Sequence, residues 1–129
     1  MSMVLITGGT GAIGSALVRE FAKTDDVIFT YNTNKERARA LAGGSCFCAP
    51  MDISDTGSVE EAVQNVLREF SHIDILVNNA GISLIKPFTD ISEDEWERQL
   101  SVNLSGTFRV TRAGVPGMIS RKRGAIVNI

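Results

Sequence analysis

The segment TGGTGAIG, residues 7–14, is the feature that most limits how this chain can fold. It follows the apolar run MVLIT (3–7) and opens an amphipathic stretch that extends from Ala12 to Lys23. A continuous apolar run bounded by glycines is typical of a strand buried on both faces of a parallel sheet. A glycine-rich turn between such a strand and a helix can direct backbone N–H groups toward a phosphate group. The segment therefore predicts a strand, an anion-binding turn and a helix. The alternative is an ordinary glycine-rich connection.

Short apolar runs and helical stretches continue to alternate along the chain. Further strands are predicted at VIFTY (27–31), CFCAP (46–50), IDILV (73–77) and GAIVNI (124–129), and further helices over 35–41, 59–70 and from Ser92 to about Ser120. Strands and helices joined by such short connections form right-handed βαβ units. The predicted fold class is therefore α/β, a Rossmann-like doubly wound parallel sheet that is truncated after the fifth strand.

The last predicted helix carries three end signals. Ser92 followed by Glu95 is the signature of an N-terminal capping box. Pro116 is expected to kink this helix or to end it early, because proline has no amide hydrogen to donate. The cationic segment RKRG (121–124) predicts a helix C-terminus with its glycine as the terminating residue.

The composition of the chain excludes several classes of function. The 129 residues are 43% hydrophobic and 22% charged, which is typical of one globular domain. Thirteen Lys and Arg against fifteen Asp and Glu give a net charge of −2, so neither nucleic acid nor an anionic membrane is an expected partner. The apolar runs are short and the first residues lack a signal-peptide pattern, which favours a cytoplasmic protein without a membrane-spanning helix.

Cys46 and Cys48 are separated by one residue, and His72 is the only histidine. Cysteine pairs that bind metal or act as redox pairs usually show C-x-x-C spacing. We therefore expect free thiols in a strand, a turn position for His72 and no metal site.

The residues of the glycine-rich turn have distinct expected roles. Gly8 permits the tight turn, Gly11 lets the backbone approach phosphates, and Gly14 allows close packing of helix against strand. Thr10 offers a hydroxyl group to phosphate. A P-loop is excluded because Ser15 stands where that motif requires lysine. The candidate cofactor-binding residues of the turn are Gly8, Gly9, Thr10, Gly11, Ala12, Ile13 and Gly14.

Four motifs in order along the chain resemble the short-chain dehydrogenase/reductase family: TGGTGAIG, the pair Asp52-Ile53, NNAG (78–81) and Asn103 in SVNLSG. The resemblance covers essentially the whole chain and the N-terminal half of a typical member. Ala12 gives the turn the form TGxxGxxG, which is usual in the extended branch of epimerases and dehydratases. NNAG and Asn103 favour the classical branch, in which Ala12 is a tolerated variation.

The resemblance implies roles for these residues. The Asp52 carboxylate would accept a hydrogen bond from the adenine amino group, and the backbone of Ile53 would contact the ring. Asn103 is the candidate catalytic residue, because the matching asparagine holds a water molecule of the family's proton relay. The NNAG turn would pack against the adenine ribose, and its candidate site residues are Asn79, Ala80 and Gly81. The simpler alternatives are a turn aspartate at position 52 and a tolerated polar helix residue at position 103.

The choice of cofactor depends on the residues at the end of the second predicted strand. A site for NAD needs an acidic residue there, which accepts a hydrogen bond from the ribose 2′-hydroxyl. Residues 31–35 contain no carboxylate, and the cations Lys35 and Arg37 could attract a 2′-phosphate. NADP(H) is therefore favoured over NAD(H), with Tyr31 and Asn32 as site residues. The alternative for the two cations is a solvated helix start.

Within the family, the chain most resembles 3-oxoacyl-acyl carrier protein reductases, enzymes of fatty acid biosynthesis. This resemblance implies hydride transfer from nicotinamide to a small-molecule carbonyl or acyl-thioester substrate, with a tyrosine as the acid and a lysine that lowers its pKa. In the family these two residues and a serine follow the fifth strand. Residues 1–129 are therefore expected to form an incomplete NAD(P)-binding domain, inactive alone, from a parent that is a homodimer or homotetramer.

Two other interpretations stay open. One is a non-catalytic nucleotide-binding module. The other is a fragment of an extended-type nucleotide-sugar epimerase or dehydratase.

Overall fold

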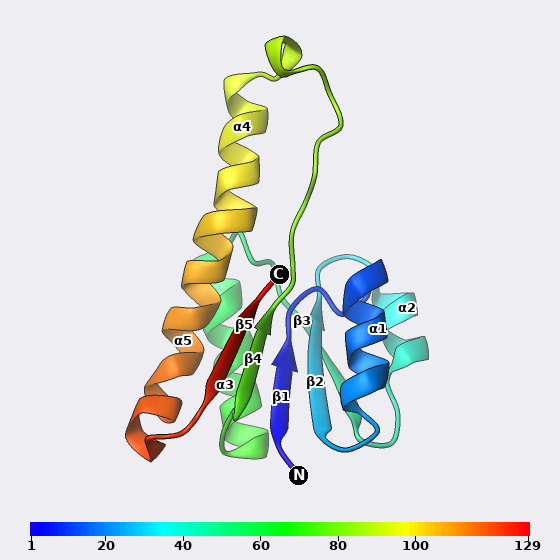
Figure 1. Ribbon diagram of the computed structural model, residues 1–129, viewed down its shortest axis with the longest axis vertical. Coiled ribbons are helices and arrows are strands. Elements are labelled where there is room, and N and C mark those ends of the chain that lie inside the picture. The colour runs from blue at the N-terminus through cyan, green and yellow to red at the C-terminus, as the bar shows by residue number, and fades with distance from the viewer.

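The computed structural model of residues 1–129 is built around one sheet of five parallel strands (Figure 1). The strands are β1 (Met3–Ile6), β2 (Asp26–Tyr31), β3 (Cys46–Pro50), β4 (Ile75–Asn78) and β5 (Ala125–Asn128). Their order across the sheet is β3-β2-β1-β4-β5, so the order reverses at β1, which pairs with both β2 and β4. The predicted Rossmann-like α/β fold is confirmed.

Helices cover both faces of this sheet (Figure 1). One face carries α1 (Ala12–Phe21) and α2 (Lys35–Leu41), and the other carries α3 (Thr56–Phe70) and α5 (Gly106–Arg121). No helix combines the length and the apolar character that crossing a bilayer requires. The layers are those that successive βαβ units produce.

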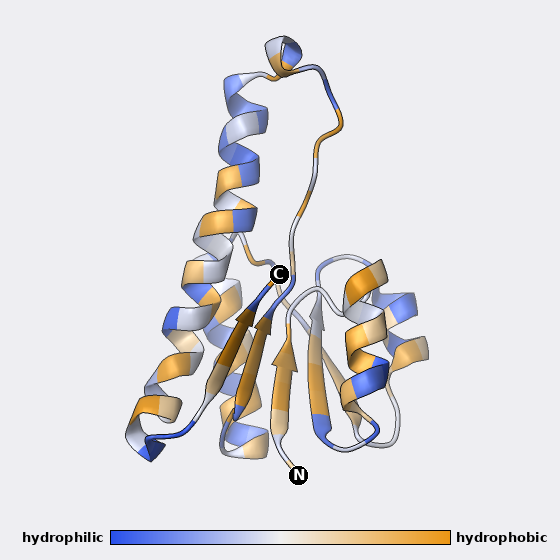
Figure 2. Ribbon diagram, viewed as in Figure 1, coloured by the Kyte–Doolittle hydropathy of each residue, from blue (hydrophilic) through white to orange (hydrophobic).

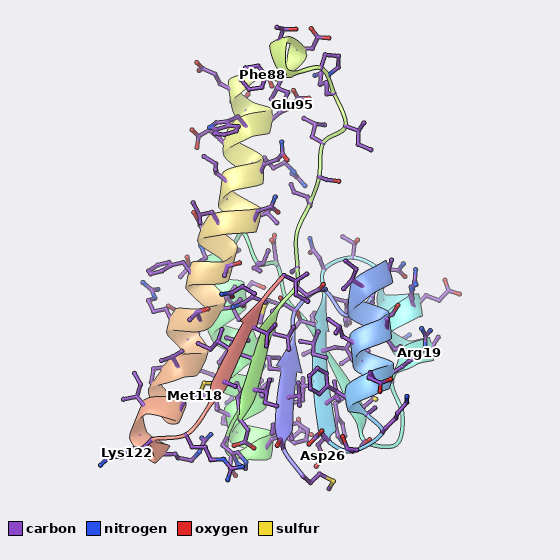
Figure 3. The ribbon with its side chains drawn as sticks, viewed as in Figure 1. Arg19, Asp26, Phe88, Glu95, Met118 and Lys122 are labelled. Atoms are coloured by element: carbon purple, nitrogen blue, oxygen red, sulfur yellow. The ribbon has the colours of Figure 1, made fainter.

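An arm extends beyond the carboxyl end of the sheet. It contains the 3-10 helix η1 (Phe88–Asp90) and helix α4 (Glu93–Leu100), and the π-helical turn η2 (Ser101–Ser105) joins α4 to α5. Phe88 and Glu95 lie near the far tip of the arm, and Lys122 lies at the opposite end of the molecule (Figure 3). Within the arm, Glu95 accepts hydrogen bonds from Lys86 Nζ at 2.9 Å. One nearly continuous helical rod therefore runs from the arm to the base of the sheet.

The sheet separates two apolar cores, because successive side chains of a strand point to opposite faces. On β1, Val4 and Ile6 pack with Val18 of α1 and Ala38 of α2. Leu5 points to the other face, where it packs with side chains of α3 and α5. Figure 2 shows the apolar residues concentrated on the strands. Burial on both faces fixes the register of the central strands.

The ends of the last helix follow the predictions only in part. The capping box is confirmed: Ser92 Oγ accepts from the Glu95 amide at 3.2 Å, and the Ser92 amide donates to Glu95 Oε2 at 2.9 Å. Pro116 does not end the helix, since α5 continues through it to Arg121. Pro116 is exposed, so water can solvate the carbonyl that lacks an amide partner.

The C-terminus of α5 is also built differently from the prediction. The left-handed residue is Lys122, with φ of +52°, rather than the glycine of RKRG. Gly124 is needed for a different reason: a Cβ atom there would lie 2.6 Å from Cγ of Met118. The glycine therefore lets the chain pass closely over α5 before it enters β5.

Candidate functional site

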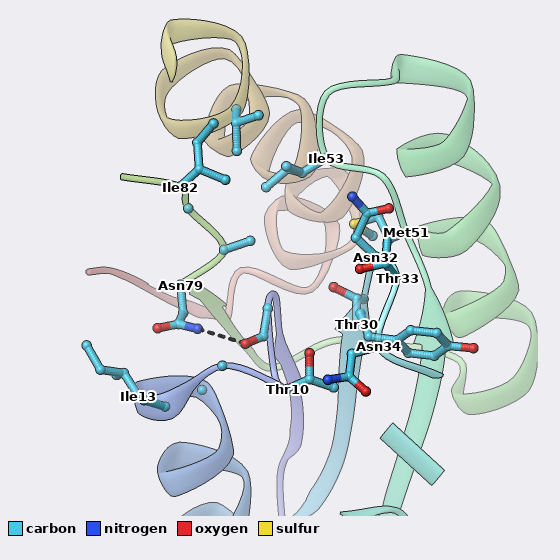
Figure 4. Close-up of a pocket in the computed structure, with 18 residues that line it drawn as sticks. Thr10, Ile13, Thr30, Asn32, Thr33, Asn34, Met51, Ile53, Asn79 and Ile82 are labelled. Atoms are coloured by element: carbon cyan, nitrogen blue, oxygen red, sulfur yellow. Dashed lines mark hydrogen bonds between the residues drawn. The ribbon is translucent and has the colours of Figure 1, made fainter. Parts of the chain in front are cut away.

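A cleft of about 440 Å³ opens at the carboxyl ends of β1, β2 and β4 (Figure 4). It lies where the strand order reverses, which is the position at which open parallel sheets bind ligands. All but two of the residues predicted to bind a cofactor line it: Gly8, Thr10, Gly11, Ala12, Ile13, Gly14, Tyr31, Asn32, Ile53, Asn79, Ala80 and Gly81. Gly9 and Asp52 are outside the lining. None of the lining residues carries a charged side chain.

Six lining residues were missed by the sequence prediction: Thr30, Thr33, Asn34, Met51, Ile82 and Val102. Most of them are next to predicted site residues at the ends of strands. Their place after a strand is the sequence signal from which they could have been predicted. Val102 is different, because it comes from η2 and reaches the cleft only through the fold.

Three glycines of the turn are required by the packing of the protein itself. Gly8 has a φ of +68°, and a Cβ atom there would lie 2.8 Å from Cα of Ala80. At Gly9 a Cβ atom would lie 2.5 Å from Phe29, which explains why Gly9 faces the sheet and not the cleft. At Gly14 a Cβ atom would collide with the carbonyl oxygen of Gly8, so helix α1 packs directly on the turn. The expected roles of Gly8 and Gly14 fit this geometry.

Gly11 is different, because the protein leaves space beside it. The nearest atom to a Cβ at this position would be the Gly8 carbonyl oxygen, at 3.5 Å. Gly11 is also the N-cap of α1, and no side chain caps this helix. In contrast, Asn34, Asp55 and Ser92 cap α2, α3 and α4. The first amides of a helix have no partner within it.

These features test whether a dinucleotide fits the cleft. The start of α1 presents unpaired backbone donors and the positive end of a helix dipole to the cleft, and no carboxylate lines it. The turn beside Gly11 has room for a ligand to approach the backbone. The residues present therefore fit a pyrophosphate group.

Thr7 joins the glycine turn to the NNAG segment. Its buried hydroxyl oxygen accepts hydrogen bonds from the amides of Asn79 and Ala80, both at 3.0 Å. In return, Nδ2 of Asn79 donates to the carbonyl oxygens of Thr7 at 3.0 Å and Gly8 at 3.2 Å. The two loops on either side of the strand reversal are thus held as one unit. Thr7 was not among the predicted site residues.

Asp52 makes the contacts of a turn aspartate. Its Oδ1 accepts from the amide of Ser54 at 2.9 Å and from the Ser54 hydroxyl at 2.6 Å. These two bonds from Ser54 are the main reason why the pKa of Asp52 is lowered from its ordinary value. Ile53, the next residue, lines the cleft (Figure 4). The expected adenine contact of Asp52 stays a prediction.

The end of β2 supplies neutral polar groups to the cleft. Tyr31 is largely buried, and Asn32, Thr33 and Asn34 follow it along the cleft wall (Figure 4). Oδ1 of Asn34 accepts from the amide of Arg37 at 3.0 Å, which leaves the amide nitrogen of Asn34 as a donor. Lys35 and Arg37 are exposed on α2 and do not line the cleft.

Asn103 lies in the π-helical turn η2 and holds the opposite wall of the cleft. Its Oδ1 accepts from the amide of Ile82 at 2.8 Å, and its Nδ2 donates to the carbonyl of Ile82 at 2.8 Å. The close approach also explains Gly81, since a Cβ atom there would lie 3.2 Å from Oδ1 of Asn103. The structure thus gives a reason for an asparagine inside a helix. Its catalytic role stays a prediction.

The cysteines and the histidine lie outside this cleft. Cys46 and Cys48 are free thiols on β3, and burial raises the pKa of the Cys46 thiol. His72 precedes β4, and its Nε2 lies 3.2 Å from Oδ2 of Asp74. No group of three or more His, Cys, Asp or Glu side chains is placed to hold a metal ion.

Comparison with known proteins gives consistent matches. The profile of the short chain dehydrogenase family matches residues 2–129. NADP-dependent 3-hydroxy acid dehydrogenase YdfG of Shigella flexneri is 34% identical over 98% of this chain and 53% of its own length. The 3-oxoacyl-[acyl-carrier-protein] reductase FabG of Chlamydia pneumoniae is 33% identical over 98% of this chain and 53% of its own length.

A solved structure, the closed form of serine dehydrogenase complexed with NADP+, superposes with a TM-score of 0.90 at 35% identity. The match covers 98% of this chain and 52% of that one. The chain spans about half the length of the curated relatives it matches.

Proposed function

We propose that this chain, which belongs to the short-chain dehydrogenase family, is the NADP(H)-binding part of an oxidoreductase that acts on a small carbonyl or alcohol compound. The single observation that carries the proposal is the start of α1. This helix has no side-chain cap, opens on the cleft at the strand reversal and follows a turn with free space beside Gly11. A pyrophosphate would supply the missing acceptors.

Each part of the cleft has a proposed partner in the dinucleotide. The first turn of α1 and Thr10 would bind the pyrophosphate. Ile53 would lie against the adenine, with Asp52 beside it, and Asn79 to Gly81 would border the ribose. When bound, the cofactor supplies the hydride; this chain orients it and shields its pyrophosphate from water. Residues 1–129 would thus act as one NAD(P)-binding domain.

Preference for NADP(H) is proposed from the end of β2. No carboxylate lines the cleft there, so no negative side chain would repel a 2′-phosphate. Asn32, Thr33 and the free amide nitrogen of Asn34 offer neutral donors instead. The YdfG relative is NADP-dependent and the serine dehydrogenase structure holds NADP+, which supports the same choice.

The substrate is proposed by analogy with two relatives. The name of YdfG describes a 3-hydroxy acid and that of FabG a 3-oxoacyl group, so both compounds carry an oxygen on the third carbon. We therefore propose a 3-oxoacyl or 3-hydroxyacyl compound as substrate. Asn103 would contribute by fixing the backbone of Ile82 at the edge of the cleft.

A homo-oligomeric parent is proposed from the outer face of α5. Phe108 and Ile119 of this helix and Leu104 of the adjoining turn η2 are all largely exposed, and Ile126 of β5 lines the same groove. Exposed apolar side chains gathered in one groove favour burial against another protein surface.

Binding of NADPH and NADH to the purified protein tests the cofactor proposal. We expect tighter binding of NADPH, measured by calorimetry or nucleotide fluorescence. Asn32→Asp should reduce the preference for NADPH by about tenfold or more, because the new carboxylate repels the 2′-phosphate. Asn65→Asp is the matched control, since it adds the same charge on the exposed side of α3.

Gly11→Ala tests the pyrophosphate contact in the same assay. Its Cβ has space in the free protein, so stability should hold while NADPH affinity falls. Equal affinity for the two nucleotides would contradict the NADP(H) assignment. Failure of the unmodified protein to bind either nucleotide would remove the cofactor proposal altogether.

A further inference from the structure

Helix residues between Ser101 and Arg109 contact both walls of the cleft. On one wall, Asn103 holds the backbone of Ile82 through two hydrogen bonds. On the other wall, the loop after β3 carries Ile53, and two different residues of α5 contact it. Figure 4 places Ile53 and Ile82 on different segments around the cleft.

The first contact comes from the half-buried guanidinium of Arg109. Its Nη1 donates to the carbonyl oxygen of Ile53 at 3.2 Å and to the carbonyl oxygen of Ser101 at 2.9 Å. One nitrogen thus bridges the loop after β3 and the π-helical turn η2. Arg109 is not among the residues that line the cleft, so it acts on the cleft through the segments that it contacts, the loop with Ile53 and the turn η2.

The second contact is steric. A Cβ atom at Gly106 would lie 2.6 Å from Cγ1 and 3.1 Å from Cδ1 of Ile53. The side chain of Ile53 therefore sits directly on the backbone of α5. Any larger residue at position 106 would push Ile53 away from the helix.

The loop 52–55 has no other hydrogen bond that fixes its position against α5. The amide of Asp52 donates to the hydroxyl of Ser58, and Asp52 and Asp55 accept from nearby amides. Apart from the bond with Arg109, the hydrogen bonds of this loop stay within residues 52–59. These local bonds determine the shape of the loop. Its distance from the opposite wall is determined by the bond with Arg109 and by packing.

We propose that Arg109 is a positioning residue for the adenine side of the cleft: it holds Ile53 at a fixed place against η2 while Asn103 holds the other wall from the same turn. This inference rests on the proposed NADP(H) site. The role belongs to the guanidinium because it donates to two carbonyl groups at once.

The experiment compares binding of the two halves of the cofactor to Arg109→Met and to the unmodified protein. We expect affinity for 2′,5′-ADP to fall about tenfold, since a hydrogen bond from a charged group is lost. Affinity for reduced nicotinamide mononucleotide should change less than twofold. Hydrogen exchange at the amides of residues 53–55 should accelerate, which reports the loop independently of any ligand.

Three further variants sharpen the test. Arg112→Met removes a guanidinium of the same helix that pairs with Glu60 at 3.2 Å, and it should leave both affinities unchanged. Arg109→Lys should recover part of the 2′,5′-ADP affinity. Gly106→Ala raises helix propensity but displaces Ile53. It should therefore also lower the affinity for 2′,5′-ADP more than the affinity for reduced nicotinamide mononucleotide. If Arg109→Met does not fold, the lysine and alanine variants carry the test.

The outcomes separate this inference from the proposed function. If the unmodified protein binds neither 2′,5′-ADP nor NADPH, the proposed function itself is wrong. If it binds both and Arg109→Met binds 2′,5′-ADP equally well, only the positioning role is wrong. Equal weakening of both halves would also overturn the role, because it would indicate a general loss of stability.

Discussion

Strands β1 and β5 have similar apolar sequences but opposite environments. β1 reads MVLI and is buried throughout, whereas β5 reads AIVN and leaves Ile126 42% and Val127 45% exposed. β1 has a strand on each side and a core on each face, but β5 pairs with β4 alone. An apolar run therefore encodes a strand, while neighbours in space decide how much free energy its side chains contribute.

Substitutions in the two strands should show the largest difference. Leu5→Ala removes a fully buried side chain from a packed core, so it should lower the free energy of unfolding by about 3 kcal/mol. Ile126→Ala truncates a side chain that is already partly in water, and the loss should stay below about 1 kcal/mol. Urea unfolding of both variants measures the two values. Similar losses would mean that β5 is covered in solution.

Two glycines extend the same contrast to the helices. Gly14→Ala drives a methyl group into the Gly8 carbonyl and to 2.8 Å from Nδ2 of Asn79, so we expect about 1–3 kcal/mol of destabilisation. Gly117→Ala in α5 meets only Arg121 Nη1, at 3.6 Å, and should stabilise the helix by about 0.5–1 kcal/mol. Thermal unfolding compares them. Destabilisation by Gly117→Ala would show that α5 is packed more tightly than its exposed face indicates.

Substitution of Asp74 should change stability least. This carboxylate contacts the amide of Met3 in β1 and the guanidinium of Arg121 in α5, and such contacts at the protein surface contribute little free energy. The amide of Met3 donates to Oδ2 of Asp74 at 3.0 Å, and this bond is the main reason why the Asp74 pKa is lowered. The charges of His72, Arg121 and Arg123 lower the pKa further. A carboxylate whose pKa is lowered in the folded state stabilises the protein at pH values above its ordinary pKa. This contribution is lost as the pH falls through the pKa of the folded state.

Asp74→Asn should therefore be less stable than the unmodified protein at pH 7, by about 1 kcal/mol or less. The difference should shrink as the pH falls below about 4. Unfolding at several pH values, with Asp90→Asn in the exposed arm as the control, tests this expectation. A difference that is independent of pH would assign the effect to packing and not to charge.

Local patterns in the sequence predicted most elements and the place of the site. The helix over 35–41 and the strand over 46–50 match α2 and β3, and the motif residues gather at one cleft because each follows a strand. Gly9 and Asp52 do not line the cleft, since Gly9 packs on Phe29 and Asp52 bonds within its own turn. In both cases the contact with a neighbouring residue, and not membership of the motif, determines where the residue faces.

The features that the sequence did not predict depend on distant contacts. The bond from Arg109 to Ile53 spans 56 residues, and the bonds of Thr7 to the NNAG segment span more than 70. The π-helical turn at Ser101–Ser105 has no local signal either. Pro116 is a strong local signal for a helix end, yet α5 continues through it. The periodicity of a sequence predicts contacts between successive turns of one helix. It cannot predict a hydrogen bond to a carbonyl group on a distant loop.

The pairing of β1 with β4 also determines when the cleft can form during folding. The amide of Thr7 donates to the carbonyl of Val77 at 3.0 Å, across a separation of 70 residues. Closing so long a loop costs conformational entropy before any contact offsets it, so such pairings are slow. We therefore expect the cleft to form after this step, later than the local β1–α1–β2 unit. A ligand that binds there would therefore act mainly on the unfolding rate and leave the folding rate nearly unchanged.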